Sequence, residues 1–106
     1  MLVDFFIAGV QKGGTTALDY FLRQHPSVEM AGRKEVHFFD DEALDWSRPD
    51  YELLHRFFAW ERDNVLRGEA TPIYSYWPGS IERIHRYNPK AKIVVGLRHP
   101  SLLCKL

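Results

Sequence analysis

The sequence predicts an α/β fold in which helices cover both faces of a parallel sheet, giving three layers. Two segments, 3–9 and 92–97, are rich in strand-forming residues and apolar enough to be buried on both faces. An amphipathic helical pattern follows the first of them, over 15–25, and another precedes the last, over 80–87. Strands that alternate with helices in this way are typical of a parallel sheet.

The first element is a strand over 3–9, which begins almost at the initiator methionine. Three glycines within 9–14 then break the apolar pattern. After them the apolar residues recur at helical spacing, with Leu18 and Leu22 on one side of the predicted helix. Pro26 ends this helix, because the residue before a proline avoids the α conformation. The chain therefore opens as a strand, a glycine-rich loop and a helix.

The middle of the chain carries shorter elements. A short strand is predicted at 28–30. Segment 33–40 has charges at one end and aromatic residues at the other, and we interpret it as a loop. A helix is predicted from Asp50, whose carboxylate can cap it, to about residue 59. A second short strand is predicted over 65–70.

The last elements are a loop, a helix and a strand. Segment 72–79 is aromatic and interrupted by proline and glycine, and it either lines a ligand cleft or packs in the core. Ser80 is expected to cap the following helix, which Pro89 stops. Only nine residues follow the strand at 92–97. A doubly wound sheet needs more chain than this, so we expect one incomplete domain over 1–106.

The composition restricts the classes of partner. There are 14 basic and 14 acidic side chains, so bulk charge gives no attraction to nucleic acid or to an anionic membrane. No apolar run approaches the ~18 residues that span a membrane, and the N-terminus lacks the features of a signal peptide. The single cysteine, Cys104, excludes an intrachain disulfide. We therefore expect a cytoplasmic protein without nucleic-acid or membrane partners, and the oligomeric state stays open.

The glycine-rich loop between the first strand and its helix predicts an anion site. Glycines let the backbone come close to an anion, and a helix N-terminus offers N–H groups that have no partner within the helix. Two threonine hydroxyls and one lysine ammonium group add further donors. The residues expected to form this phosphate site are Gln11, Lys12, Gly13, Gly14, Thr15 and Thr16.

The spacing of this loop differs from that of the ATP- and GTP-binding P-loop. Gly9 and Gly14 satisfy G-x-x-x-x-G, but Thr15 stands where the P-loop has lysine. The lysine lies inside the loop instead, and no acidic residue for Mg²⁺ is evident. The loop predicts a parallel sheet of the P-loop NTPase-like type. A small-molecule kinase that uses ATP with Mg²⁺ and a glycine turn without a ligand stay open as alternatives.

Four segments, in order, resemble those of sulfotransferases that use 3'-phosphoadenosine 5'-phosphosulfate (PAPS). Segment 11–18, Q-K-G-G-T-T-A-L, is similar to the family's loop for the 5'-phosphosulfate group. Segment 33–40, R-K-E-V-H-F-F-D, resembles the heparan-sulfate-type branch and its bacterial relatives. Segments 68–74, G-E-A-T-P-I-Y, and 92–100, K-I-V-V-G-L-R-H-P, complete the match. The resemblance covers nearly the whole chain and implies a partial sulfotransferase domain.

The resemblance implies transfer of a sulfuryl group from PAPS to a hydroxyl or amine of an acceptor, either a carbohydrate or a small molecule. Lys12 would stabilise the charge that develops on the leaving phosphate, and residues 13–16 would hold the 5'-phosphate. Arg98 follows the last strand and would bind the 3'-phosphate, which a guanidinium can hold with two N–H groups. The resemblance implies no metal.

The same resemblance implies Glu35 as the base that takes the acceptor's proton and His37 as a second catalytic residue. Asp40 falls where that branch carries a residue that supports the base or the acceptor. Spacing alone does not select Glu35 from the other acids. A solvated pair of Lys34 with Glu35, and a packing role for His37, stay open.

The chain departs from the family pattern at three positions. Leu103 and Leu106 stand where the family carries the arginine and serine of an Arg-x-x-Ser motif, so the 3'-phosphate half of the site is expected to be damaged or missing. Ala70 stands where members that act on heparan carry lysine, which weakens the case for a polysaccharide acceptor. A non-catalytic remnant that folds without binding the donor also stays open.

Overall fold

The sheet consists of four parallel strands. The computed structural model describes residues 2–9 and 14–95, and for residues 14–17 it describes the backbone. The strands are β1 (Phe5–Ile7), β2 (Val28–Met30), β3 (Leu66–Ala70) and β4 (Lys92–Val94). They lie in the order β2–β3–β1–β4, so the first strand of the chain is in the interior of the sheet. Phe5 pairs with Gly68 on one side and with Lys92 on the other.

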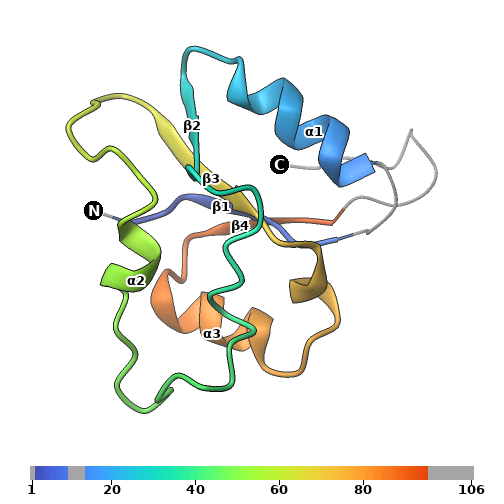
Figure 1. The fold of residues 1–106 in the computed structure, drawn as a ribbon, viewed down its shortest axis with the longest axis vertical. Coiled ribbons are helices and arrows are strands. Elements are labelled where there is room, and N and C mark those ends of the chain that lie inside the picture. The colour runs from blue at the N-terminus through green and yellow to red at the C-terminus, as the bar shows by residue number, and fades with distance from the viewer. Residues whose placement is uncertain (1, 10–13, 96–106) are drawn as a thin grey trace.

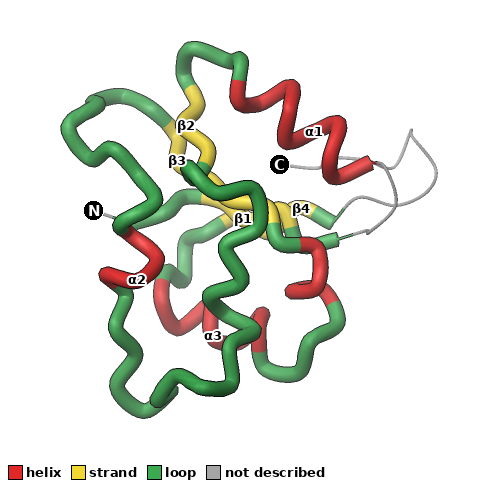
Figure 2. Tube along the Cα trace, in the orientation of Figure 1, coloured by secondary structure: helices red, strands yellow, loops and turns green. Residues whose placement is uncertain are grey.

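Helices cover both faces of this sheet. Helix α1 (Gly14–Arg23) lies on one face, and α2 (Glu52–His55) and α3 (Ser80–Tyr87) lie on the other (Figure 1). A 3₁₀ helix, η1 (Pro72–Ser75), follows β3 on the side of α3. The long loop from β2 to α2 runs over the same side (Figure 2). This arrangement confirms the predicted three-layer α/β fold with a parallel sheet.

The two faces of β1 contribute to two separate cores. Phe6 lies in the larger core, where its ring contacts those of Phe39, Tyr74 and Tyr87 edge-on. Ile7 lies in the smaller core, against which Leu18 and Leu22 of α1 pack. Successive residues of a strand point to opposite faces, so an uninterrupted apolar run is what burial of both faces requires.

The helix predicted over 50–59 is wrong in length, because α2 has four residues. After α2, backbone groups bond to the end of β2 instead of continuing the helix. The Ala59 N–H donates to the Glu29 carboxylate, and the Phe57 carbonyl accepts from the Gly32 N–H at 2.7 Å. Tertiary hydrogen bonds thus replace the helical ones. The other predicted helices and strands are present. Strand β2 has the predicted bounds, β1 is two residues shorter at each end than predicted, and β3 begins one residue later.

The predicted cap of α3 is also wrong. Gly79 is the N-cap residue, with a left-handed φ of 84°, and Ser80 is the first residue of the helix. The Ser80 hydroxyl donates instead to the carbonyl of Phe39 at 3.2 Å. Arg83 donates to the same carbonyl at 2.9 Å. Both bonds fasten the loop after β2 to α3, and that loop carries the candidate catalytic residues.

Candidate active site

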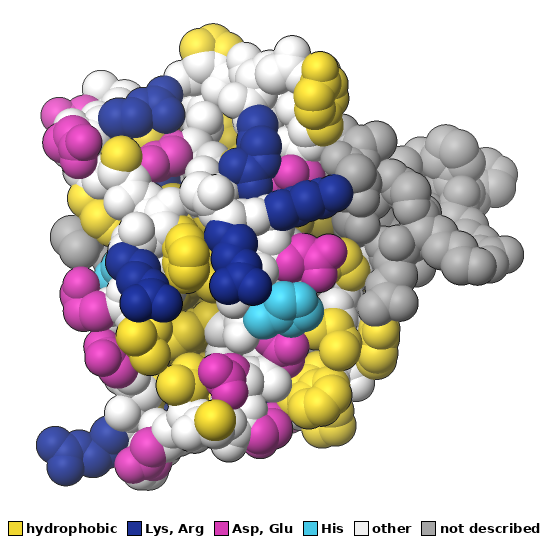
Figure 3. Space-filling view, in the orientation of Figure 1, with side chains coloured by type: hydrophobic (Ala, Val, Ile, Leu, Met, Phe, Trp, Pro, Cys, Tyr) yellow, Lys and Arg dark blue, Asp and Glu magenta, His cyan; other side chains and the backbone are white. Residues whose placement is uncertain are grey.

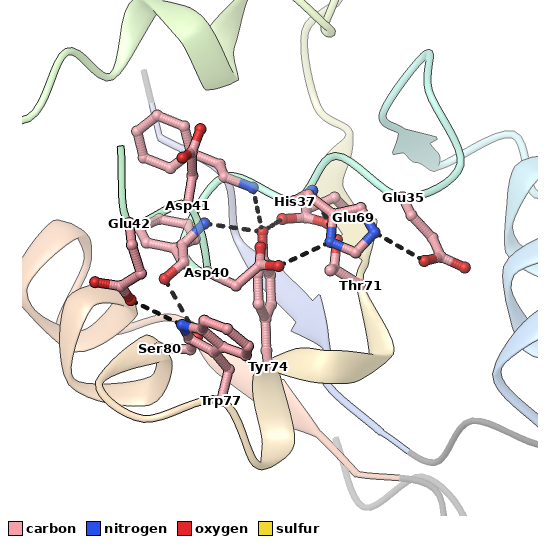
Figure 4. A network of polar contacts seen from close by, with 12 residues as sticks. Glu35, His37, Asp40, Asp41, Glu42, Glu69, Thr71, Tyr74, Trp77 and Ser80 are labelled. Carbon is pink, nitrogen blue, oxygen red and sulfur yellow. Dashed lines mark hydrogen bonds and ion pairs between the residues drawn. The ribbon is translucent and has the colours of Figure 1, made fainter. Parts of the chain in front are cut away.

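Polar residues gather at the carboxyl end of the strands, which is the edge where α/β sheets bind ligands. The loop after β2 brings Glu35 and His37 to this edge, and the segment after β3 brings Thr71 and Tyr74 (Figure 4). Helix α1 begins at Gly14, at the end of the glycine-rich segment of the sequence. Segments far apart in the sequence therefore converge on one edge because the strands are parallel.

Glu35, His37 and Asp40 form a cluster in which an imidazole lies between two carboxylates (Figure 4). Nδ1 of His37 is 2.9 Å from Oδ2 of Asp40, and Nε2 is 3.1 Å from Oε1 of Glu35. The side chains of Glu35 and His37 are 45% and 43% exposed, whereas that of Asp40 is 11% exposed. The ring therefore links a mostly buried carboxylate to one that faces solvent.

The surroundings of His37 favour its protonated form. Partial burial alone would lower its pKa, but the hydrogen bonds and negative charges of Asp40 and Glu35 outweigh burial and raise the pKa of His37 above its ordinary value. A protonated imidazole carries an N–H on both nitrogens, so it can donate to both carboxylates at once. The backbone of His37 has a φ of 56°, which is uncommon for a residue with a side chain.

A fully buried carboxylate, Glu69, lies beside this cluster (Figure 4). Oε1 accepts a hydrogen bond from the Thr71 hydroxyl and Oε2 accepts one from the Tyr74 hydroxyl, both at 2.6 Å. Burial raises the pKa of Glu69 to about 7, although these two bonds act in the opposite direction. Burial, together with the neighbouring Glu69, also raises the pKa of Tyr74, so its phenol stays neutral and remains a donor.

The raised pKa of Glu69 makes the stability of the fold depend on pH. The folded chain binds the Glu69 proton more tightly than the unfolded chain, so this contribution is complete below pH 4.5 and disappears as the pH rises to about 7. Glutamine has no such proton. We expect the unfolding free energy of the wild type, relative to Glu69→Gln, to fall by roughly 3 kcal/mol between pH 4.5 and pH 8, as measured by urea denaturation.

The comparison of the wild type with Glu69→Gln cancels the titrating groups that do not interact with Glu69. His37 does interact with it, and its raised pKa removes stability in the same direction as the pH rises. Glu82→Gln is a matched control, because Glu82 is exposed in the first turn of α3. It should leave the pH dependence of the wild type unchanged. A difference between wild type and Glu69→Gln that stays constant across this range would contradict the raised pKa.

A groove of about 180 Å³ opens beside His37. Its lining combines apolar side chains with two basic residues, Arg33 and Arg56, and with the acidic Asp41. Figure 3 shows Lys and Arg side chains gathered across the middle of one face, among acidic and apolar ones. A groove next to a histidine–carboxylate cluster can hold a substrate group against a base.

The structure brings together the three acid–base residues predicted from the sequence, whereas most of the predicted donor site is outside the described residues. Gly14 begins α1, and Thr15 and Thr16 lie in its first turn, which confirms the predicted helix after the glycine-rich segment. Donor binding by these residues stays a prediction. The predicted site residues outside the described part of the chain are Gln11, Lys12, Gly13 and Arg98. Among the described residues, no group of His, Cys, Asp and Glu is arranged to hold a metal ion.

The sequence interpretation missed the polar layer beneath the cluster. The sequence predicts an aromatic loop around Tyr74 that either lines a cleft or packs in the core, and Tyr74 lies in the core, fully buried. Glu69 is not among the residues that the sequence predicts for the site. Its signal in the sequence is an acidic residue inside a strand, followed two residues later by the hydroxyl of Thr71. An acid buried in a strand needs hydrogen-bond donors close by.

The chain is similar to sulfotransferases in both sequence and structure. It is 41% identical over 97 residues to heparan sulfate glucosamine 3-O-sulfotransferase 6 of Mus musculus, and the match covers 89% of the chain and 26% of that protein. It is 31% identical over 102 residues to the membrane-associated sulfotransferase kil1 of Dictyostelium discoideum, covering 93% of the chain and 21% of the relative. No protein-family model matches the chain.

A solved structure agrees with these relatives. The crystal structure of a sulfotransferase from Alicyclobacillus acidocaldarius superimposes with a TM-score of 0.75 at 31% identity, and the match covers 90% of the chain and 44% of that structure. The fold and the site define an α/β protein of the P-loop NTPase-like type. Within that class, the chain belongs to the sulfotransferase family. It spans about a quarter or less of the length of these curated relatives.

The expectation of a cytoplasmic location is wrong. The Dictyostelium relative is named as membrane-associated, so membership of this family does not imply the cytoplasm. The expectation came from the absence of an apolar run and of a signal peptide, and neither absence identifies a compartment. In the described residues, none of the helices combines the length and the apolar character needed to span a bilayer.

Proposed function

We propose that the protein containing this chain transfers a sulfuryl group from PAPS to a hydroxyl or amine group of a carbohydrate acceptor. The observation that carries the proposal is the Glu35–His37–Asp40 cluster at the carboxyl edge of the sheet. The carbohydrate acceptor is supported by relatives named as heparan sulfate glucosamine sulfotransferases. Arg33 and Arg56 in the neighbouring groove are compatible with an acceptor that carries negative charge.

In this proposal Glu35 is the general base. Its carboxylate is exposed and accepts a hydrogen bond from His37, which fixes its orientation while leaving it open to an acceptor. Glu35 takes the proton of the acceptor hydroxyl or amine as the new oxygen–sulfur or nitrogen–sulfur bond forms. The bound donor supplies the sulfuryl group, its sulfur–oxygen bond to phosphate breaks, and adenosine 3',5'-bisphosphate leaves with the bonding electron pair.

His37 and Asp40 hold this base in position. The 11% exposed carboxylate of Asp40 orients Nδ1 of the His37 ring, so that Nε2 points to Glu35. The positive charge of a protonated His37 is balanced by the carboxylates on both sides. The arrangement of carboxylate, imidazole and carboxylate is compatible with repeated proton transfer, because the proton gained by Glu35 returns to solvent through its exposed side.

The donor site is proposed at the start of α1. The backbone N–H groups of the first helical turn lack partners within the helix and can bind a phosphate. Gly9, which precedes this site in the sequence, packs against η1, and a Cβ atom there would lie 2.9 Å from Oγ of Ser75. Lys12 would stabilise the leaving phosphate and Arg98 would hold the 3'-phosphate. The other proposed donor ligands are Gln11, Gly13, Gly14, Thr15 and Thr16.

Titration with adenosine 3',5'-bisphosphate tests the donor site directly. We expect binding by the wild type, and a loss of about 1–3 kcal/mol of binding free energy in Lys12→Ala, as for a charge-assisted hydrogen bond. Isothermal titration calorimetry without added metal measures this loss. Lys90→Ala is the matched control, because Lys90 is an exposed lysine at the other end of the sheet, before β4.

The outcomes separate the three functions that the sequence leaves open. Equal affinity in wild type and Lys12→Ala would contradict the role of Lys12. Turnover of ATP that requires Mg²⁺ would favour a kinase instead. A thermal stability unchanged by the bisphosphate would indicate a domain that folds without binding the donor. Domain limits of 1–106 are likewise a proposal, which limited proteolysis of the longer protein would test.

A further inference from the structure

We propose that Glu69 is a positioning residue for the Glu35–His37–Asp40 cluster. Glu69 does not touch this cluster through its own carboxylate. Glu69 acts through the hydroxyls of Thr71 and Tyr74. These hydroxyls accept hydrogen bonds from backbone N–H groups of the loop that carries His37. This inference rests on the proposed function, because it assigns Glu69 to the same site.

A continuous chain of hydrogen bonds joins Glu69 to that loop (Figure 4). The Thr71 hydroxyl donates to Glu69 and accepts the N–H of His37 at 3.3 Å. The Tyr74 hydroxyl donates to Glu69 and accepts the N–H groups of Phe38 at 3.0 Å and Phe39 at 3.2 Å. Three consecutive N–H groups of the loop thus donate to two hydroxyls, and both hydroxyls donate to the same carboxylate.

Glu69 determines how the two hydroxyls are oriented, because each hydroxyl has a single hydrogen to donate. A hydroxyl has one hydrogen to donate and lone pairs to accept with. Because the hydrogens of Thr71 and Tyr74 are both directed at Glu69, their lone pairs face the N–H groups of the loop. Above about pH 7 this carboxylate is ionised, so it accepts on both oxygens and fixes both hydroxyls in this orientation. An amide at the same place can accept on one side only, and its NH₂ group would turn the other hydroxyl around.

The loop needs this support where His37 lies. Its φ of 56° is a conformation that costs free energy for a residue with a side chain and persists only when neighbouring contacts impose it. The N–H of His37 is bonded to Thr71, so this bond helps to hold the residue in that conformation. The direction of the ring toward Asp40 and Glu35 depends in turn on this backbone. Loss of the Glu69 carboxylate should therefore move the ring, although Glu69 is not bonded to it.

The test compares Glu69→Gln and Thr71→Val with the wild type. Nitrogen-15 NMR of the histidine rings follows the titration of His37, identified by its absence in His37→Asn. The groups that face His37 are Glu35, Asp40 and, through its charge, Glu69. We expect both variants to move the pKa of His37 down toward its ordinary value, because the ring leaves its two carboxylate partners.

Thr71→Val separates positioning from charge. This variant keeps the Glu69 carboxylate but removes the hydroxyl that accepts the His37 N–H. If Glu69→Gln moves the His37 titration and Thr71→Val does not, the effect comes from the charge of Glu69, and the proposal is overturned. Titration of His37 unchanged in both variants would overturn it as well.

Tyr87→Phe controls for a general loss of stability. The Tyr87 hydroxyl is also buried and also accepts a backbone N–H, that of Val3 at 2.7 Å, but it bonds to His55 and not to the cluster. We expect this variant to lose stability and to leave the His37 titration unchanged. A His37 titration that moves equally in Tyr87→Phe would show a structural effect only, and would contradict positioning by Glu69.

Rates of sulfuryl transfer add a second readout. We expect Glu69→Gln to lower kcat by about 10- to 100-fold, as for a misplaced catalytic group, with little change in KM for the donor. The two hypotheses fail in different ways. Absence of transfer in the wild type would contradict the proposed function, whereas an unchanged His37 titration in the variants would contradict the positioning role.

Discussion

Replacing Glu35 with glutamine is expected to lower the rate of sulfuryl transfer by about 10²- to 10⁴-fold, the range supplied by a general base. Glutamine has nearly the shape of glutamate and its carbonyl can still accept the hydrogen bond from Nε2 of His37. It cannot take a proton from the acceptor. The initial rate of transfer of labelled sulfuryl group from PAPS to heparan sulfate measures the loss.

The affinity for adenosine 3',5'-bisphosphate should be unchanged in Glu35→Gln, since Glu35 is not among the proposed donor ligands. Glu82→Gln, an exposed glutamate of α3, should transfer at the wild-type rate. If Glu35→Gln retained more than about a third of the wild-type rate, Glu35 could not be the base, because removal of a base costs far more than that.

The second large effect concerns the core. We expect Phe6→Ala to lower the free energy of unfolding by about 3–5 kcal/mol, as for other truncations of buried aromatic residues. Phe6 is fully buried in β1, and its ring contacts those of Phe39, Tyr74 and Tyr87. Urea denaturation followed by circular dichroism measures the loss. A domain has only about 5–15 kcal/mol of stability in total, so this change removes much of it.

Phe21→Ala provides the matched control, because it makes the same chemical change on the surface of α1. The Phe21 side chain is 65% exposed, and its truncation should change the unfolding free energy by no more than about 0.5 kcal/mol. Similar losses in Phe6→Ala and Phe21→Ala would mean that Phe6 does not lie in the core described above.

The sequence predicts most of the fold because the main elements are locally determined. The helical spacing of Leu18 and Leu22 and the apolar run of β1 are both visible in short windows. The errors arise where distant groups decide the backbone. The helix at α2 stops early because Glu29 and Gly32 bond to residues after it, and no local pattern near residue 56 contains that information.

The candidate site was predictable only through resemblance. Glu35, His37 and Asp40 lie in a loop, where spacing carries no rule about which side chains meet. Their convergence depends on the left-handed conformation of His37, which is unusual for this residue. The support from Glu69 could not be predicted, because its partners Thr71 and Tyr74 meet the loop after β2 only in the folded chain.

The interior place of β1 in the sheet has a consequence for the order of folding. Its neighbours are Gly68–Ala70 on one side and Lys92–Val94 on the other, so it pairs only with segments that are made at least sixty residues later. Contacts this distant in sequence form slowly, because a long loop must close first. During synthesis, β1 therefore stays unpaired until the segment that forms β3 has left the ribosome.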